Sequence, residues 1–122
     1  MYLEKANGYY CFLSVLSPLG GIDILVNNAM ISHSPPKSSQ CAPLFETDEV
    51  LWDKLTNVGY KGYFFAMQAA ARHMVAQKRG GSLLCIGSVH ACNPVAEWAV
   101  YSSMKAGVRW PFRNSVAFIS AN

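Results

Sequence analysis

The sequence contains little charge and no apolar run of membrane length. Only 14% of its 122 residues are charged, whereas 52% are hydrophobic and 12% aromatic. This balance excludes an intrinsically disordered chain, because disorder requires few apolar residues and much charge. No apolar run reaches the ~18 residues of a membrane span, so we expect no membrane segment. The length suits one domain, and we predict a single domain over residues 1–122.

The spacing of the cysteines and of the basic residues argues against disulfide-rich, metal-binding and nucleic-acid-binding proteins. Cysteines at positions 11, 41, 85 and 92 have no close paired spacing, which argues against a disulfide framework and a metal site. Cys85 lies in an apolar run and is expected as a small buried residue. The net charge is +3 with basic residues scattered singly, which argues against nucleic-acid binding. A faint signal-like stretch at 9–16 has no convincing cleavage site, so we expect a cytoplasmic protein with reduced thiols.

Glycine and proline positions predict alternating strands and helices. The expected elements are a weak helix over 3–16, a buried strand over 22–26, a polar loop over 31–44, a helix from an N-cap at Thr47 to about Lys78, a strand over 82–86 and a helix from near Glu97 or Trp98. Strand, helix, strand and helix in this order are typical of a parallel sheet covered by helices, with a right-handed crossover. Pro111 falls inside the last helix, where a proline costs about 3 kcal/mol.

The long central helix carries two apolar rows. The first consists mostly of small residues, which allow close approach to a sheet, and we expect it to face the strands: Leu55, Gly59, Gly62, Ala66, Ala69 and His73. His73 is then a packed histidine and not a metal ligand, because no companion ligands accompany it. The second row comprises Tyr60, Phe64, Met67, Ala71 and Met74. One buried face needs one row, so the second indicates another layer or a partner subunit.

Three polar residues form a candidate catalytic group. Tyr101 and Lys105 are four residues apart on the last helix and share one face. A lysine ammonium beside a phenol stabilises the phenolate, which makes the tyrosine usable as an acid and base. Ser88 follows the second strand, at the sheet edge where open parallel sheets bind ligands. A Tyr-x-x-x-Lys pair alone is a weak signal, since such pairs are common on helix surfaces.

Several segments in the same order resemble the short-chain dehydrogenase/reductase family. The matching segments are Gly21-Ile22-Asp23-Ile24-Leu25-Val26-Asn27-Asn28-Ala29, Gln68-Ala69-Ala70-Ala71-Arg72-His73-Met74, Gly80-Gly81-Ser82, Ile86-Gly87-Ser88 and Tyr101-Ser102-Ser103-Met104-Lys105-Ala106-Gly107-Val108. The resemblance covers about residues 20–109. It implies an α/β fold, a partial Rossmann-type (doubly wound) parallel sheet with flanking helices.

The resemblance also implies hydride transfer between an alcohol and a ketone with NAD or NADP. It makes Tyr101 the acid and base, Lys105 the residue that holds the nicotinamide ribose, and Ser88 the residue that polarises the substrate oxygen. Asn28 and Ala29, in the Asn-Asn-Ala segment, would lie at the cofactor together with Tyr101 and Lys105. No metal is implied, and the partners are a small alcohol or ketone and other subunits in a homo- or hetero-oligomer.

The sequence departs from the family pattern at several positions. No Gly-x-x-x-Gly-x-Gly turn occurs in the 122 residues, although backbone amides of such a turn receive the cofactor pyrophosphate. Aligned on Lys61-Gly62, the position of the catalytic Asn is Gly59, and Asn57 lies about 200° round the helix. Met30 stands where the family has glycine. We therefore interpret the chain as a truncated member.

Two function classes follow from this pattern. The first is an oxidoreductase, impaired by the missing phosphate turn, that uses Ser88, Tyr101 and Lys105. The alternative is a non-catalytic fragment or interaction module that pairs with an intact relative through its helices, as the second apolar row indicates. His90 and Trp98 have no distinctive spacing. Asn27 and Asn28 either hold the strand end by hydrogen bonds or contact a cofactor, and the structural role is favoured because side-chain amides often fix loops.

Overall fold

The computed structural model describes residues 20–31 and 42–115, with side chains up to residue 109. The elements are β1 (Ile24–Asn27), the 3₁₀ turn η1 (Leu44–Glu46), α2 (Glu49–Thr56), the π-helical segment η2 (Asn57–Gly62), α3 (Tyr63–Ala76), β2 (Ser82–Cys85), the 3₁₀ turn η3 (Val89–Ala91) and α4 (Ala99–Ser115). The helix expected over 3–16 and most of the loop expected over 31–44 lie outside these ranges, as do Cys11 and Cys41.

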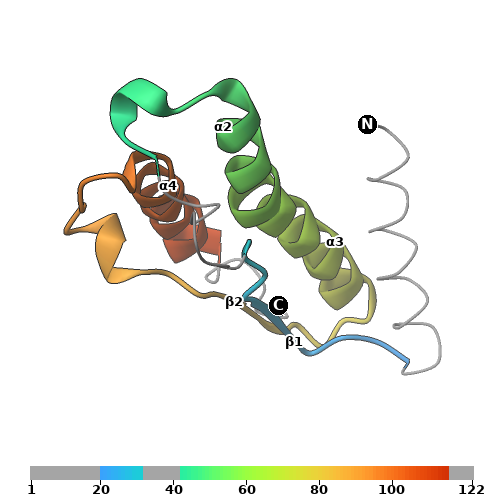
Figure 1. Cartoon of the computed structure of the whole chain (residues 1–122). Coiled ribbons are helices and arrows are strands. Elements are labelled where there is room, and N and C mark those ends of the chain that lie inside the picture. Colours follow the sequence, from blue (N-terminus) through green and yellow to red (C-terminus); the bar gives the residue numbers. More distant parts are fainter. Residues whose placement is uncertain (1–19, 32–41, 116–122) are drawn as a thin grey trace.

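The two strands form a parallel pair, as the order of the elements predicted. Ile24 is paired with Ser82 and Asn27 with Cys85, and the long helix connects the strands. Figure 1 shows the rod of α2 and α3 beside α4, both on the same side of the strands. The α/β class is therefore confirmed, and in the described part of the chain the helices cover one face of the sheet.

The outward face of this sheet is apolar and exposed. Ile24 and Val26 on β1 have exposed fractions of 64% and 52%, and Leu84 and Ile86 each have 45%. The alternate residues Leu25, Leu83 and Cys85 instead pack against the helices, as period-two alternation requires.

The long helix begins one residue later than the sequence predicted. Asp48 has an extended backbone, and its carboxylate accepts a hydrogen bond of 2.7 Å from the Leu51 N–H, so Asp48 is the N-cap. The Thr47 hydroxyl donates to the Pro43 carbonyl instead, at 3.1 Å. A carboxylate at the positive end of a helix also favours this arrangement.

A π-helical turn shifts the buried row of the helix by one residue. The expected row continued from Gly59 to Gly62, Ala66, Ala69 and His73. Of these later positions Ala69 is buried, but the residues of this helix in the core cluster are Tyr63, Met67, Ala70 and Met74. The segment Asn57–Gly62 is a π turn, and such a turn adds one residue to the helical repeat. Met67 and Met74 of the second row therefore belong to the core, while Tyr60 and Phe64 are partly exposed.

The core lies between α3, α4 and the strands. It consists of Tyr63, Met67, Ala70, Met74, Leu83 and Val108. α4 runs through Pro111 to Ser115, so the proline removes one backbone donor without ending the helix. No helix in the described ranges combines the length and hydrophobicity needed to cross a membrane.

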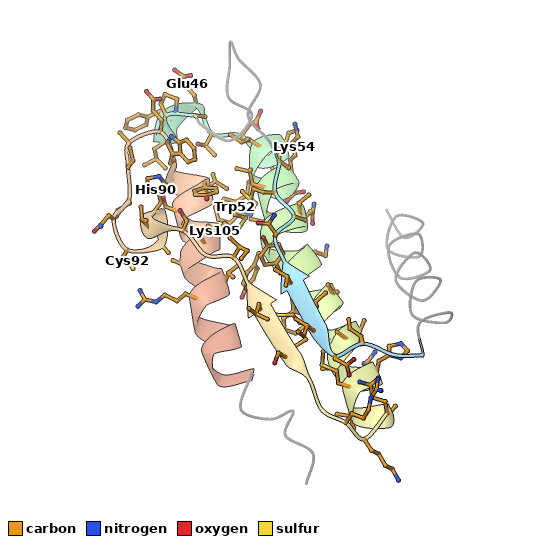
Figure 2. The ribbon with its side chains drawn as sticks, turned by 90° about the horizontal axis from the view of Figure 1, so that it is seen from below. Glu46, Trp52, Lys54, His90, Cys92 and Lys105 are labelled. Atoms are coloured by element: carbon orange, nitrogen blue, oxygen red, sulfur yellow. The ribbon has the colours of Figure 1, made fainter. Side chains whose placement is uncertain are left out.

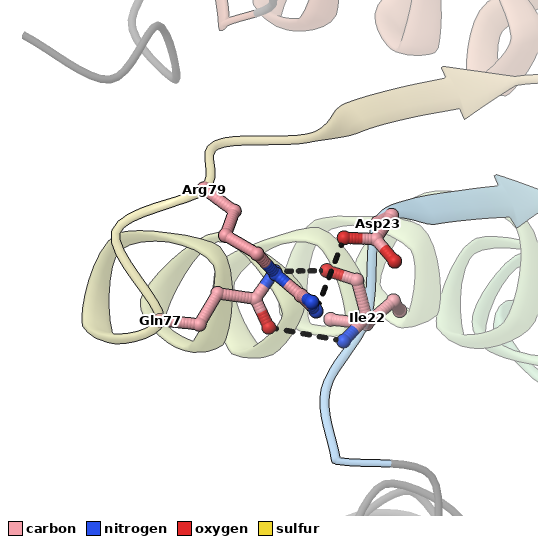
Figure 3. Close-up of polar contacts among 4 residues, drawn as sticks. All are labelled: Ile22, Asp23, Gln77 and Arg79. Atoms are coloured by element: carbon pink, nitrogen blue, oxygen red, sulfur yellow. Dashed lines mark hydrogen bonds and ion pairs between the residues drawn. The ribbon is translucent and has the colours of Figure 1, made fainter.

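Gln77 connects the end of α3 to the start of β1 (Figure 3). Its side-chain oxygen accepts from the Ile22 N–H at 3.2 Å, and its amide nitrogen donates to the Ile22 carbonyl at 2.6 Å. Beside it, Arg79 and Asp23 form an ion pair of 3.3 Å whose side chains are both exposed. The part-buried pair of hydrogen bonds satisfies the backbone groups of Ile22, which precedes β1.

Candidate active site

Ser88 lies three residues beyond β2, where the chain turns towards α4. It is the N-cap of η3, and its hydroxyl oxygen accepts a hydrogen bond of 3.2 Å from the His90 N–H. This contact uses an acceptor position of the hydroxyl and leaves its proton for donation to another group. The structure thus places Ser88 at the carboxyl edge of the sheet, as expected.

Tyr101 lies in the first turn of α4 within a group of aromatic rings. Its ring stands edge-on to that of Trp98, with centroids 5.0 Å apart, and 6.1 Å from that of His90. The His90 Nδ1 atom lies 3.3 Å from the Asn93 carbonyl. These contacts hold the half-buried phenol beside the segment that carries Ser88.

Lys105 is buried, with an exposed fraction of 3%. Its ammonium donates a 2.6 Å hydrogen bond to the Ile86 carbonyl, and Nζ lies 5.9 Å from the centroid of the Tyr101 ring. In Figure 2, Lys105 extends from α4 towards the segment that follows β2. Burial lowers the pKa of Lys105, and the nearby Cys85 thiol opposes this effect because a thiolate would stabilise the ammonium.

Asn27, at the end of β1, forms hydrogen bonds to α3 and to the end of β2. Its side-chain amide donates to the Tyr63 carbonyl at 3.4 Å and to the Cys85 sulfur at 3.5 Å. Asn27 therefore has the structural role expected of it. Cys85 is half-buried and is a hydrogen-bond partner as well as a packing residue. Burial raises the pKa of its thiol, while the Asn27 bond and the Lys105 charge lower it.

The helix that faces Lys105 has no asparagine side chain at the site. Gly59 is buried, and a Cβ atom there would overlap the end of the Met104 side chain, lying 2.8 Å from its Cε. Asn57 is exposed and accepts a 3.4 Å hydrogen bond from Lys61, one turn along the helix. Met104 therefore fills the space that a side chain at position 59 would need.

Asn28 and Ala29 follow β1 on the exposed carboxyl edge of the sheet, and Met30 is half-buried. Their place agrees with a position beside a ligand at that edge. The polar groups at this edge also fit the ribose and nicotinamide end of a dinucleotide. The Lys105 ammonium has three protons, and Ile86 accepts one of them. For the pyrophosphate, the described residues offer no glycine turn after a strand, because Gly20 and Gly21 precede β1.

Two residues at the site had no signal in the sequence. Tyr63 reaches the core only because of the π turn, and His90 meets Tyr101 only because η3 folds back onto α4. The periodicity of a regular helix points away from Tyr63, and His90 lies in a loop. A group of three or more possible metal ligands does not occur among residues 20–31 and 42–115.

The fold and the site are typical of one class of protein, the α/β proteins in which a serine, a tyrosine and a lysine lie at the carboxyl edge of a parallel sheet. Comparison with known proteins narrows that class. The family model of the short chain dehydrogenases matches residues 11–117, and the chain belongs to this family. The Rossmann-type fold and the relation to oxidoreductases expected from the sequence are therefore confirmed.

Some of the similar proteins are named for sugar alcohols or sugar acids. The chain is 34% identical over 107 residues to a 2-dehydro-3-deoxy-D-gluconate 5-dehydrogenase of Escherichia coli, covering 87% of this chain and 40% of that protein. It is 36% identical over 105 residues to a sorbitol dehydrogenase of Cereibacter sphaeroides, covering 86% and 38%. A gluconate 5-dehydrogenase of Burkholderia cenocepacia, solved with NADP and tartrate, superposes with a TM-score of 0.79 at 32% identity, covering 92% and 41%. The chain thus spans about 40% of the length of these relatives.

Proposed function

We propose that this chain carries the catalytic centre of an NAD(P)-dependent oxidoreductase that interconverts an alcohol and a ketone. The observation that carries the proposal is the position of the buried Lys105: its Nζ lies 5.9 Å from the centroid of the Tyr101 ring and donates to the carbonyl of Ile86, two residues before Ser88. The family comparisons favour this function over a non-catalytic interaction module.

Each residue then has a defined task. Ser88 donates a hydrogen bond to the substrate oxygen and keeps its proton, while the oxygen of its hydroxyl accepts from the His90 N–H. Tyr101 gives its proton to that oxygen during reduction and takes it back during oxidation. Lys105 stabilises the phenolate that Tyr101 leaves behind.

Tyr101 and Lys105 would hold the nicotinamide ribose, with Asn28 and Ala29 alongside. When bound, the nicotinamide supplies or accepts the hydride. We leave both NAD and NADP as candidates, and one similar structure contains NADP. Sugar alcohols and sugar acids are the first substrates to test, because similar proteins are named for them.

Two further expectations belong to this proposal. We propose that the chain forms oligomers through the outer face of α2 and α3, where Trp52, Phe64 and Phe65 are partly exposed. Large apolar side chains gathered on one surface are typical of protein contacts. A cytoplasmic location remains a prediction from the sequence.

The test is turnover of NADH and NADPH with a panel of sugar alcohols, sugar acids and their ketones. We expect Tyr101→Phe to lower turnover by a factor of about 10² or more, the usual contribution of a general acid. Tyr60→Phe is the matched control, because it removes a phenol from a partly exposed ring on another helix. Absence of turnover in the unmodified chain, or full turnover in Tyr101→Phe, would refute the proposal.

A further inference from the structure

The hydroxyl of Tyr63 is buried and has no hydrogen-bond partner among the described residues. The side chain is 1% exposed, which makes Tyr63 one of the most enclosed large residues of the core. An unpaired hydroxyl in such a place is costly, and native proteins nearly always satisfy it with protein or water. Because Phe would fill the same space at no such cost, the hydroxyl needs an explanation.

The ring that carries this hydroxyl lies beside a residue of the candidate active site. The Lys105 ammonium lies over the Tyr63 ring, 5.3 Å from its centroid. The titratable groups facing Lys105 are Tyr63 from α3, Cys85 from β2 and Tyr101 from α4 itself. Burial raises the pKa of Tyr63, and the nearby Cys85 and Tyr101 raise it further, so the phenol remains a neutral donor and acceptor.

Tyr63 is also the polar side chain that the helix brings to Lys105. Gly59 has no side chain, Met104 fills the space beside it, and Asn57 pairs with Lys61 on the outside. The π turn that ends at Gly62 rotates Tyr63 inward. The ammonium, which has protons to donate, therefore lies over the ring that carries the unpaired hydroxyl.

We propose that Tyr63 is a positioning residue, whose hydroxyl holds an internal water that also accepts a hydrogen bond from the Lys105 ammonium. The two groups are not directly bonded, and a water between them satisfies both. The Tyr63 ring stabilises the same ammonium through its face. This inference rests on the proposed function, because it concerns the lysine that stabilises the Tyr101 phenolate.

The first experiment measures the titration of Lys105 in the full chain without cofactor. Lysines labelled with carbon-13 at Cε are followed by NMR across pH, and the Lys105 signal is assigned from Lys105→Met. We expect Tyr63→Phe to lower the pKa of Lys105 by about half a unit to one unit, since the ammonium loses a fixed water. Tyr60→Phe, which removes a phenol from the neighbouring turn, should leave the curve unchanged.

Two outcomes overturn the inference. If Tyr63→Phe titrates like the unmodified chain, the hydroxyl has no part in holding Lys105. If Tyr63→Leu shifts the curve but Tyr63→Phe does not, the ring alone acts. Should Tyr63→Phe fail to fold, a high-resolution crystal structure of the unmodified chain decides, because density for a water between Tyr63 Oη and Lys105 Nζ is expected and its absence contradicts the proposal.

Turnover separates this inference from the proposed function. In an active chain, Tyr63→Phe should move the alkaline limb of the kcat–pH profile to lower pH, because Lys105 loses its charge earlier. A purely structural role would lower kcat without moving the profile. If the unmodified chain shows no turnover, the proposed function fails while the NMR titration still tests the contact between Tyr63 and Lys105.

Discussion

Gly59 and Met104 are coupled through the space between η2 and α4. A Cβ atom at position 59 would lie 2.8 Å from the Met104 Cε and closer still to its sulfur, whereas ordinary contact begins at 3.4 Å. Gly59→Ala must therefore displace the end of a side chain that is itself buried. The structure predicts that the cost of this substitution depends on the residue at position 104.

The magnitude follows from two opposing effects. Forcing an extra methyl group into a packed core costs about 1–3 kcal/mol, while replacing glycine by alanine within a helix gains about 1 kcal/mol. Because the Met104 side chain is flexible, we expect the cost of displacing it to lie in the middle of the range of about 1–3 kcal/mol. We expect Gly59→Ala to lower the free energy of unfolding by about 1 kcal/mol. In a Met104→Ala background the overlap is absent, and Gly59→Ala should raise the free energy of unfolding by up to ~1 kcal/mol.

A double-mutant cycle measured by urea unfolding and circular dichroism gives the coupling directly. The expected coupling energy between positions 59 and 104 is about 2 kcal/mol. Gly87→Ala is the matched control, because a Cβ atom there meets nothing within 4 Å. Equal effects of Gly59→Ala in both backgrounds would refute the reasoning. The same overlap predicts that Gly59→Asn needs a smaller residue at 104 before an asparagine fits there.

Two further predictions concern other polar contacts. Gln77→Ala should lower the free energy of unfolding by about 1–3 kcal/mol, because it leaves the Ile22 backbone groups unpaired. Arg79→Ala, which breaks an exposed ion pair, should lower it by at most ~1 kcal/mol in the same urea titration. An equal loss of unfolding free energy in the two variants would contradict this prediction. Lys105→Met should remove a pH dependence of the free energy of unfolding. Burial lowers the pKa of Lys105 from 10.5, so between the lowered value and 10.5 the folded state binds fewer protons at this residue than the unfolded state. The unmodified chain therefore gains stability relative to the variant as pH rises through that window. A stability difference that does not change with pH would count against the burial of a charged Lys105.

The order of strands and helices could be predicted from the sequence because it depends on local signals. Glycine pairs end the elements, and the apolar runs around Leu25 and Leu83 are short enough for buried strands. The buried row of the long helix could not be predicted, because a regular helical repeat carries no sign of a π turn. A single added residue at η2 moved the core row to Tyr63, Met67, Ala70 and Met74.

The positions of Ser88, Tyr101 and Lys105 could be predicted because their spacing and the place of the strand ends define them together. Their surroundings could not. The contact of Tyr63 with Lys105 and the overlap of position 59 with Met104 depend on how two helices pack. Neither is a property of either helix alone, so no periodicity in one segment indicates it.

The anchor of Lys105 links the geometry of the site to the uncovered face of the sheet. Its ammonium is held by the carbonyl of Ile86, the residue directly after β2, whose own side chain is 45% exposed on the outward face. A two-stranded sheet is marginal by itself, and residues with few buried contacts open most readily. Any movement of Ile86 therefore moves the lysine that is proposed to stabilise the Tyr101 phenolate. It follows that whatever covers Ile24, Val26, Leu84 and Ile86 would fix the candidate catalytic group as well as the fold.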